Sequence, residues 1–179
     1  MQLVSFNDLM SNPNQFLGDA NNLVIASYGK IYGFDDGQHT NASKSGKSVK
    51  VFVGGGMFNG TNLFGLHLPD PNPELVQSTK DAGLEAVKNE MSEVPGGTFV
   101  ILYAGTSRLD KVVDLGASLA EKGAKVALLS CGCDKPAKFA RVDQVSDAEN
   151  IIVVMPDHPG ECDSEASDLA DLATKFMEL

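Results

Sequence analysis

Residues 98–130 read TFVILYAGTSRLDKVVDLGASLAEKGAKVALLS, and this stretch decides the fold. It opens with an apolar run, 98–104, that barely alternates with polar residues, which is typical of a strand covered on both faces. Ser107 predicts the start of a helix as its N-cap, and Gly123 predicts its end. A second apolar run, 124–130, follows at once. The stretch is therefore a strand–helix–strand unit, whose strands are expected to be parallel.

The same alternation extends along the chain on both sides of this unit. Short apolar runs rich in Val and Ile occupy residues 23–28, 49–53 and 150–155 and predict further buried strands. Helical patterns begin at Pro73 and after Asp163. The sequence therefore predicts an α/β fold: a three-layer sandwich with a mainly parallel, Rossmann-like sheet of about five strands.

The length of 179 residues predicts a single α/β domain. Its first sixty residues are less regular, and the polar stretch 37–48 predicts a flexible loop. No apolar run approaches the ~20 residues that a membrane-spanning helix needs. The first residues also lack the pattern of a secretory signal. We therefore expect a cytoplasmic protein.

The charge of the chain restricts its partners. A formal net charge of −10 disfavours binding to nucleic acid and to anionic membrane surfaces. The expected partner is a small-molecule ligand, and a homo-oligomer is compatible with the sequence. Residues 41–48, NASKSGKS, end like a phosphate-binding loop but precede a strand instead of following one, so they do not predict a nucleoside triphosphatase.

Two turns that directly follow predicted strands have the composition of an anion site. Glycine-rich turns and helix N-termini both present backbone N–H groups to anions. Open α/β sheets bind ligands outside the carboxyl ends of their strands. The leading hypothesis is therefore a site for a phosphorylated or nucleotide-like ligand. Its predicted binding residues are Gly54, Gly55, Gly56, Thr106, Ser107 and Arg108.

Three further residues near strand ends are the predicted chemical groups of this site. Cys131 follows the run 124–130, Asp157 follows the run 150–155, and Glu165 lies at the start of the last helix. A thiolate can act as a nucleophile, and a carboxylate can act as a nucleophile or a general base. Packing of the thiol and stabilisation of the helix dipole explain the same residues without catalysis. The sequence leaves open whether the protein is an enzyme, and which cofactor it uses, if any, is unknown from the sequence.

An alternative hypothesis is a thiol-redox or metal-binding protein. Cys131 and Cys133 form a close pair that could cycle between thiols and a disulfide. Together with His158 and Cys162 they could also form a zinc site. A non-catalytic protein that binds another protein is a further alternative.

The half of the chain from Thr98 onward resembles nucleoside deoxyribosyltransferases and related enzymes that act on glycosidic bonds. The resemblance rests on a strand that ends in a small-residue turn, 103–107, and on a later strand followed by Asp157 and by a helix headed by Glu165. It implies that Glu165 is the nucleophile.

All of these hypotheses need the groups named above to lie at one edge of the sheet. We therefore expect the strands that end at Val53, Ala104, Ser130 and Met155 to point in the same direction.

Overall fold

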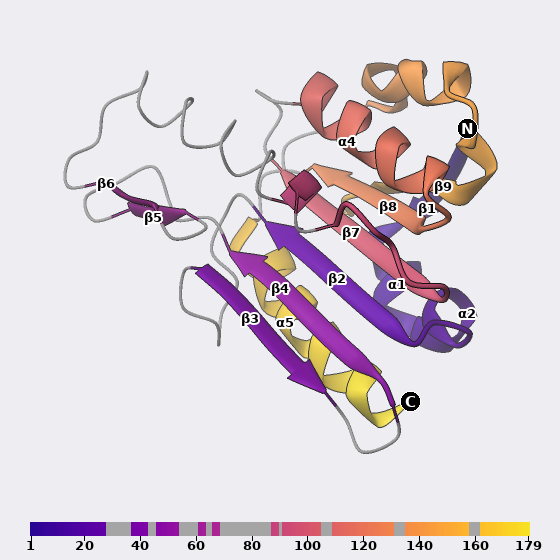
Figure 1. Ribbon diagram of the computed structural model, residues 1–179. Helices are drawn as coiled ribbons and strands as arrows, with labels where there is room; N and C mark the ends of the chain where they lie inside the picture. Colours follow the sequence, from indigo (N-terminus) through magenta and orange to yellow (C-terminus); the bar gives the residue numbers. More distant parts are fainter. Residues whose placement is uncertain are drawn as a thin grey trace.

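The structure is a computed structural model, and it describes residues 1–27, 37–42, 46–53, 61–63, 66–68, 87–89, 91–104, 109–130, 135–157 and 162–179. Its centre is a seven-stranded sheet with the strand order β1-β9-β8-β7-β2-β4-β3 (Figure 1). These strands are β1 (Gln2–Ser5), β2 (Asn22–Ser27), β3 (Gly37–Ala42), β4 (Ser48–Val53), β7 (Thr98–Ala104), β8 (Lys125–Ser130) and β9 (Ile151–Met155). A separate two-stranded antiparallel sheet comprises β5 (Thr61–Leu63) and β6 (Leu66–Leu68).

The sheet confirms the predicted fold class. All pairings between neighbouring strands are parallel except the antiparallel pairing of β3 with β4 at one edge. Each of the five predicted strands is present, with ends that differ from the prediction by at most one residue. In β2, β7, β8 and β9 the apolar side chains are buried on both faces, as is typical of strands in a parallel sheet.

Two edge strands were missed. The stretch 37–48 was predicted to be a loop, and this is wrong for residues 37–42, which form β3. The sequence of β3, GQHTNA, has almost no apolar residues from which a strand could be predicted. β3 forms because its main chain pairs with the main chain of β4. β1 has only four residues, of which Leu3 is exposed and Val4 is buried, so its apolar pattern is too short to recognise.

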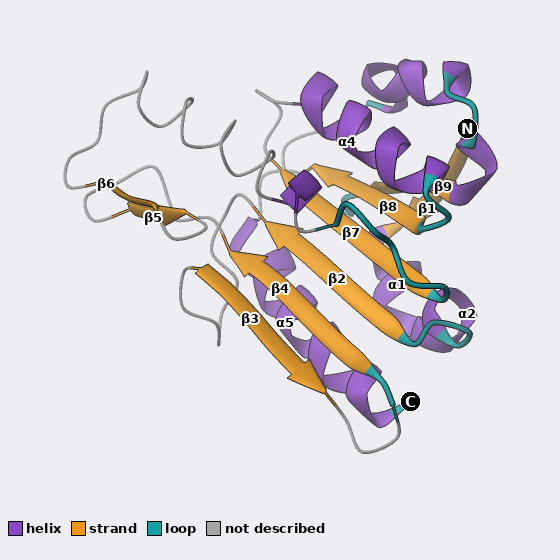
Figure 2. Cartoon of the chain, viewed as in Figure 1, coloured by secondary structure: helices purple, strands orange, loops and turns teal. Residues whose placement is uncertain are grey.

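Helices cover both faces of the sheet (Figure 2). On one face lie α4 (Leu109–Glu121) and the 3-10 helix η2 (Pro136–Gln144), which a further 3-10 turn, η3 (Ala148–Asn150), follows along the chain. On the other face lie α1 (Phe6–Ser11), α2 (Pro13–Leu17) and α5 (Cys162–Glu178). The side chains of β7 alternate between the two cores: Val100 and Leu102 pack under α4, and Phe99, Ile101 and Tyr103 pack toward α5. The three-layer prediction is therefore confirmed.

The predicted end of the helix that became α4 is also confirmed. Gly123 has a φ of 96°, which is the left-handed region that favours glycine. Its N–H donates to the carbonyl of Ala120 at 3.0 Å, and the N–H of Ala124 donates to the carbonyl of Leu119 at 3.1 Å. This pair of bonds is a Schellman motif, which satisfies carbonyl groups at the end of α4.

The helix predicted to begin at Pro73 has its first turns outside the described residues. Within the described part, residues 87–89 are helical. Val87 and Met91 are buried in the core beneath α4. This short segment therefore contributes to the same layer as α4.

No helix in the described part of the chain is long and apolar enough to cross a lipid bilayer.

The side on which the chain adds new strands to the sheet changes between β2 and β7. After β2 the chain forms β3 and then β4 on one side of β2, and it later returns to form β7 on the other side. From β7 it continues outward through β8 to β9. The point of reversal therefore lies between β2 and β7, and in open α/β sheets this is where a crevice forms at the carboxyl ends of the strands.

Candidate functional site

The predicted site requires that the carboxyl ends of several strands lie at one edge of the sheet, and the strand register shows that they do. Ser27 at the end of β2 pairs with Val53 of β4 and with Tyr103 of β7. Ala104 at the end of β7 pairs with Ser130 at the end of β8. β9 is parallel to β8, and β1 is parallel to β9. The expectation that the strands preceding the predicted site residues point in the same direction is confirmed.

Most of the predicted site residues lie directly beyond these strand ends and outside the described residues. These are Gly54, Gly55, Gly56, Thr106, Ser107, Arg108, Cys131, Cys133 and His158. Cys162 and Glu165 lie in the first turn of α5, where the backbone is described and their side chains are not. The roles assigned to all of these residues remain predictions.

Asp157 is described, and it makes a specific contact. Its carboxylate accepts a hydrogen bond of 2.7 Å from the backbone N–H of Asn7 in the first turn of α1. Ser5, the N-cap residue of α1, accepts a second bond of 3.0 Å from the N–H of Asp8. The first N–H groups of a helix have no partner within it, and an anion there is stabilising. Asp157 therefore fastens the end of β9 to the start of α1, and this contact accounts for the residue without a catalytic role.

Ser130 is a polar residue of this edge that the sequence analysis missed. It is the last residue of β8 and is fully buried. Side chains alternate along a strand, and Val126 and Leu128 belong to the core beneath α4, so Ser130 is on the same face. Among the described residues, its Oγ has no hydrogen-bond partner. A serine that ends an otherwise apolar strand next to Cys131 was the only signal in the sequence.

The Gly-Lys-Ser sequence at residues 46–48 lies at the opposite edge. Lys47 donates to the carbonyl of Ala20 at 3.1 Å, and its ammonium lies 4.8 Å from the centre of the Phe176 ring. The hydroxyl of Ser48, the first residue of β4, donates to the side-chain oxygen of Asn22 at 2.6 Å. These contacts hold the amino ends of β2 and β4 together, and Ser48 begins β4, so the Gly-Lys-Ser sequence leads into a strand as predicted.

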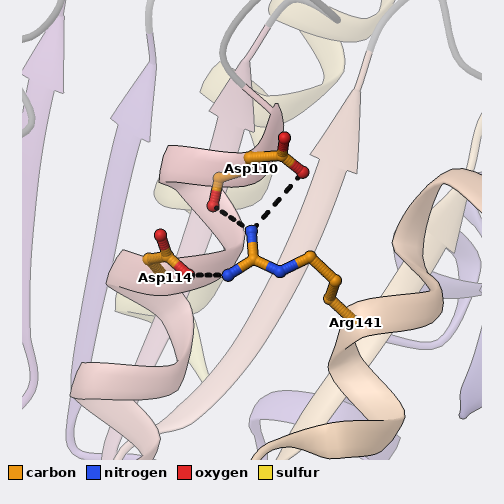
Figure 3. Close-up of polar contacts among 3 residues, drawn as sticks. All are labelled: Asp110, Asp114 and Arg141. Carbon is orange, nitrogen blue, oxygen red and sulfur yellow. Dashed lines mark hydrogen bonds and ion pairs between the residues drawn. The ribbon is translucent and has the colours of Figure 1, made fainter.

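An exposed ion-pair cluster joins η2 to the first half of α4 (Figure 3). Arg141 donates to the carbonyl oxygen of Asp110 at 3.3 Å, its Nη1 lies 3.4 Å from that residue's carboxylate, and its Nη2 is paired with the carboxylate of Asp114. The hydrogen bond and charge of Asp114, followed by those of Asp110, raise the pKa of the Arg141 guanidinium above its ordinary value. The cluster links η2 to the helix that begins directly after Arg108.

The described residues contain no group of three or more His, Cys, Asp or Glu side chains placed to hold a metal ion. Cys131, Cys133 and His158 of the alternative metal or redox site do not belong to that set. This alternative therefore stays a prediction.

Comparison of the chain with models of known protein families, with curated proteins and with solved structures found no match.

Proposed function

We propose that this protein binds a phosphorylated or nucleotide-like small molecule at the carboxyl edge of its sheet, over the ends of β2 and β7. One observation carries the proposal: β4, β2, β7, β8 and β9 are parallel, and the chain reverses direction between β2 and β7. Ligands of open α/β sheets bind in the crevice at such a reversal.

The sequence at this reversal favours an anionic ligand. The residues that join β7 to α4 include Thr106, Ser107 and Arg108. The two hydroxyls can donate hydrogen bonds, and a guanidinium can bind a phosphate or carboxylate with two parallel hydrogen bonds. α4 has 13 residues, and the partial positive charge of its N-terminus is directed toward this connection.

Ser130 supports a polar ligand at the same edge. Nearly all buried hydroxyl groups in proteins have a hydrogen-bond partner, and the missing bond costs about 1–3 kcal/mol. The Oγ of Ser130 lies at the end of β8, next to the end of β7, and lacks a partner among the described residues. Because Ser130 is fully buried, only a ligand whose binding moves the residues that cover it could supply the bond and recover this energy.

Thermal shift measurements on the full chain test the proposal. The panel consists of AMP, ADP, ATP, NAD, ribose 5-phosphate and inorganic phosphate. At a ligand concentration of about 100 times Kd, binding raises the free energy of unfolding by about 2.7 kcal/mol. A panel in which no compound raises the Tm of the wild type contradicts the proposal.

Arg108→Ala tests the predicted anion contact. Loss of a charged hydrogen bond of about 1.5–3 kcal/mol weakens the affinity roughly tenfold or more. Lys138→Ala is the control, because Lys138 is an exposed cation of η2 and its loss changes the net charge equally. Equal affinities for the two variants would remove Arg108 from the site.

A further inference from the structure

A pocket of about 400 Å³ lies at the other end of the sheet, where β7, β8 and β9 begin. Its wall includes residues of α2 and of the turn after it, and all of its lining residues are described. It is therefore separate from the carboxyl edge, and nothing in the proposed function depends on it. We call it the amino-edge pocket.

The floor of the amino-edge pocket is apolar. Phe99 of β7 and Ile152 of β9 line it and belong to the core on the α5 face, and Phe16 of α2 packs against that core. α2, which supplies part of the wall, has only five residues. An apolar cavity of about 150 Å³ holds a benzene molecule, so this pocket has room for an aromatic ring with a short side chain. Its volume also lies in the range of ~300–1,000 Å³ found for small-molecule sites.

The rim of the amino-edge pocket is negatively charged. Asp19, which follows α2, and Glu149, which precedes β9, contribute exposed carboxylates. Lys125 is the only cation among the lining residues, and its ammonium donates to the side-chain oxygen of Asn150 at 2.7 Å. Two carboxylates against one ammonium favour a cationic ligand over an anionic one. The net charge of the chain, −10, acts in the same direction.

We propose that the amino-edge pocket binds a small aromatic amine. The ring occupies the apolar floor formed by Phe16, Phe99 and Ile152, and the ammonium group is attracted by Asp19 and Glu149. The ligand class follows from charge and shape together: an apolar body suits the floor, and a positive charge suits the rim. This ligand is opposite in charge to the one proposed for the carboxyl edge.

A titration of the ¹⁵N-labelled full chain, followed by two-dimensional NMR, tests this proposal. The three probes are 2-phenylethylamine, 2-phenylethanol and phenylacetate, which share the ring and differ in charge. We expect the amine to shift backbone amide signals of residues 15–20, 97–99, 123–126 and 149–152. We also expect it to bind about two- to fivefold more tightly than the alcohol, a ratio typical of exposed ion pairs. Phenylacetate should be the weakest ligand.

Two outcomes of the titration overturn the proposal. One is the absence of shifts in these four segments, including the case in which the amine shifts only signals at the carboxyl edge. The other is binding of phenylacetate as tight as that of the amine. Neither outcome bears on the nucleotide panel, which tests the opposite edge of the sheet.

A pair of matched double variants tests the role of the rim. Asp19→Asn with Glu149→Gln removes both carboxylates from the pocket and should abolish the preference for the amine over the alcohol. Asp171→Asn with Glu178→Gln removes two exposed carboxylates of α5 that do not line the pocket. The two variants have the same net charge. If both lost the preference for the amine equally, Asp19 and Glu149 would not be the groups that attract it.

Discussion

Ser130 and Asp157 show how differently two polar residues at one sheet edge can be placed. Asp157 is exposed and its carboxylate is bonded to the N-terminus of α1. Ser130 is fully buried, and its hydroxyl has no partner within the described residues. The first arrangement stabilises the folded chain, and the second costs free energy of folding.

Replacing Ser130 by Ala should stabilise the ligand-free protein. The substitution removes a buried hydroxyl without a partner among the described residues, so we expect the free energy of unfolding to rise by about 1 kcal/mol. Urea denaturation measures this change.

Thr98→Val is the control for Ser130→Ala. Thr98 is also buried, and its hydroxyl donates to the carbonyl of Pro95 at 2.6 Å. Loss of that bond should lower the free energy of unfolding by about 1 kcal/mol. A Ser130→Ala protein that is destabilised like Thr98→Val would mean that the serine hydroxyl is bonded inside the protein.

Gly123→Ala should lower the free energy of unfolding by about 1–2 kcal/mol. The cause is the backbone alone, because φ is 96° and a Cβ at this position would meet no atom within 4 Å. Gly96 is a matched control, since a Cβ there would also meet no atom within 4 Å and its φ lies outside the left-handed range. Chemical denaturation should show little change for Gly96→Ala, and equal losses at both positions would contradict the backbone explanation.

At the scale of elements, α1 depends on a residue that is distant in the sequence. The bond between Asn7 and Asp157 joins residues 150 positions apart. Asp157→Ala should lower the free energy of unfolding by about 1 kcal/mol, as loss of a helix cap does, and should speed hydrogen exchange at the Asn7 amide. Asp171→Ala, on the exposed face of α5, should do neither. Unchanged exchange at Asn7 in the Asp157 variant would rule out the capping contact.

The packing of η2 on α4 depends on an arginine whose charge persists over the accessible pH range. A base with a raised pKa stabilises the folded state fully at every pH below its ordinary pKa, and it loses this effect only as pH rises through the higher pKa of the folded state. Arg141→Gln should therefore lower the urea midpoint by the same amount at about pH 7 and about pH 9. Added salt should reduce the difference by screening the exposed pairs. A difference that vanished by about pH 9 would exclude the ion-pair explanation.

For the whole molecule, the parallel sheet separates two kinds of surface. The carboxyl ends of β4, β7, β8 and β9 lie at one edge of the sheet, the carboxyl edge. The amino edge of the sheet carries the amino-edge pocket and the contacts of Lys47. The two proposed sites therefore lie at opposite ends of the same strands, and they favour ligands of opposite charge.

The central strands and α4 could be read from the sequence because their signals are local. An apolar run with Val and Ile predicts a strand buried on both faces, and Gly123 predicts a helix end. Neither prediction requires the position of the segment in the folded protein. The edge strands could not be read, because β3 depends on the main chain of β4 and very little on its own side chains. For the candidate site, the sequence predicted which turns follow strands, and the parallel register brought those strand ends to one edge.

The sequence by itself determined the α/β class, five strands of the sheet and the end of α4. Hydrophobic periodicity and backbone preference decide these features, and both depend on residues that are close together in the sequence. Only the tertiary structure decided the strand order, the burial of Ser130, the contact of Asp157 with Asn7 and the existence of the amino-edge pocket. Each of these depends on contacts between segments that are far apart in the chain, so no pattern within a short stretch of sequence predicts it.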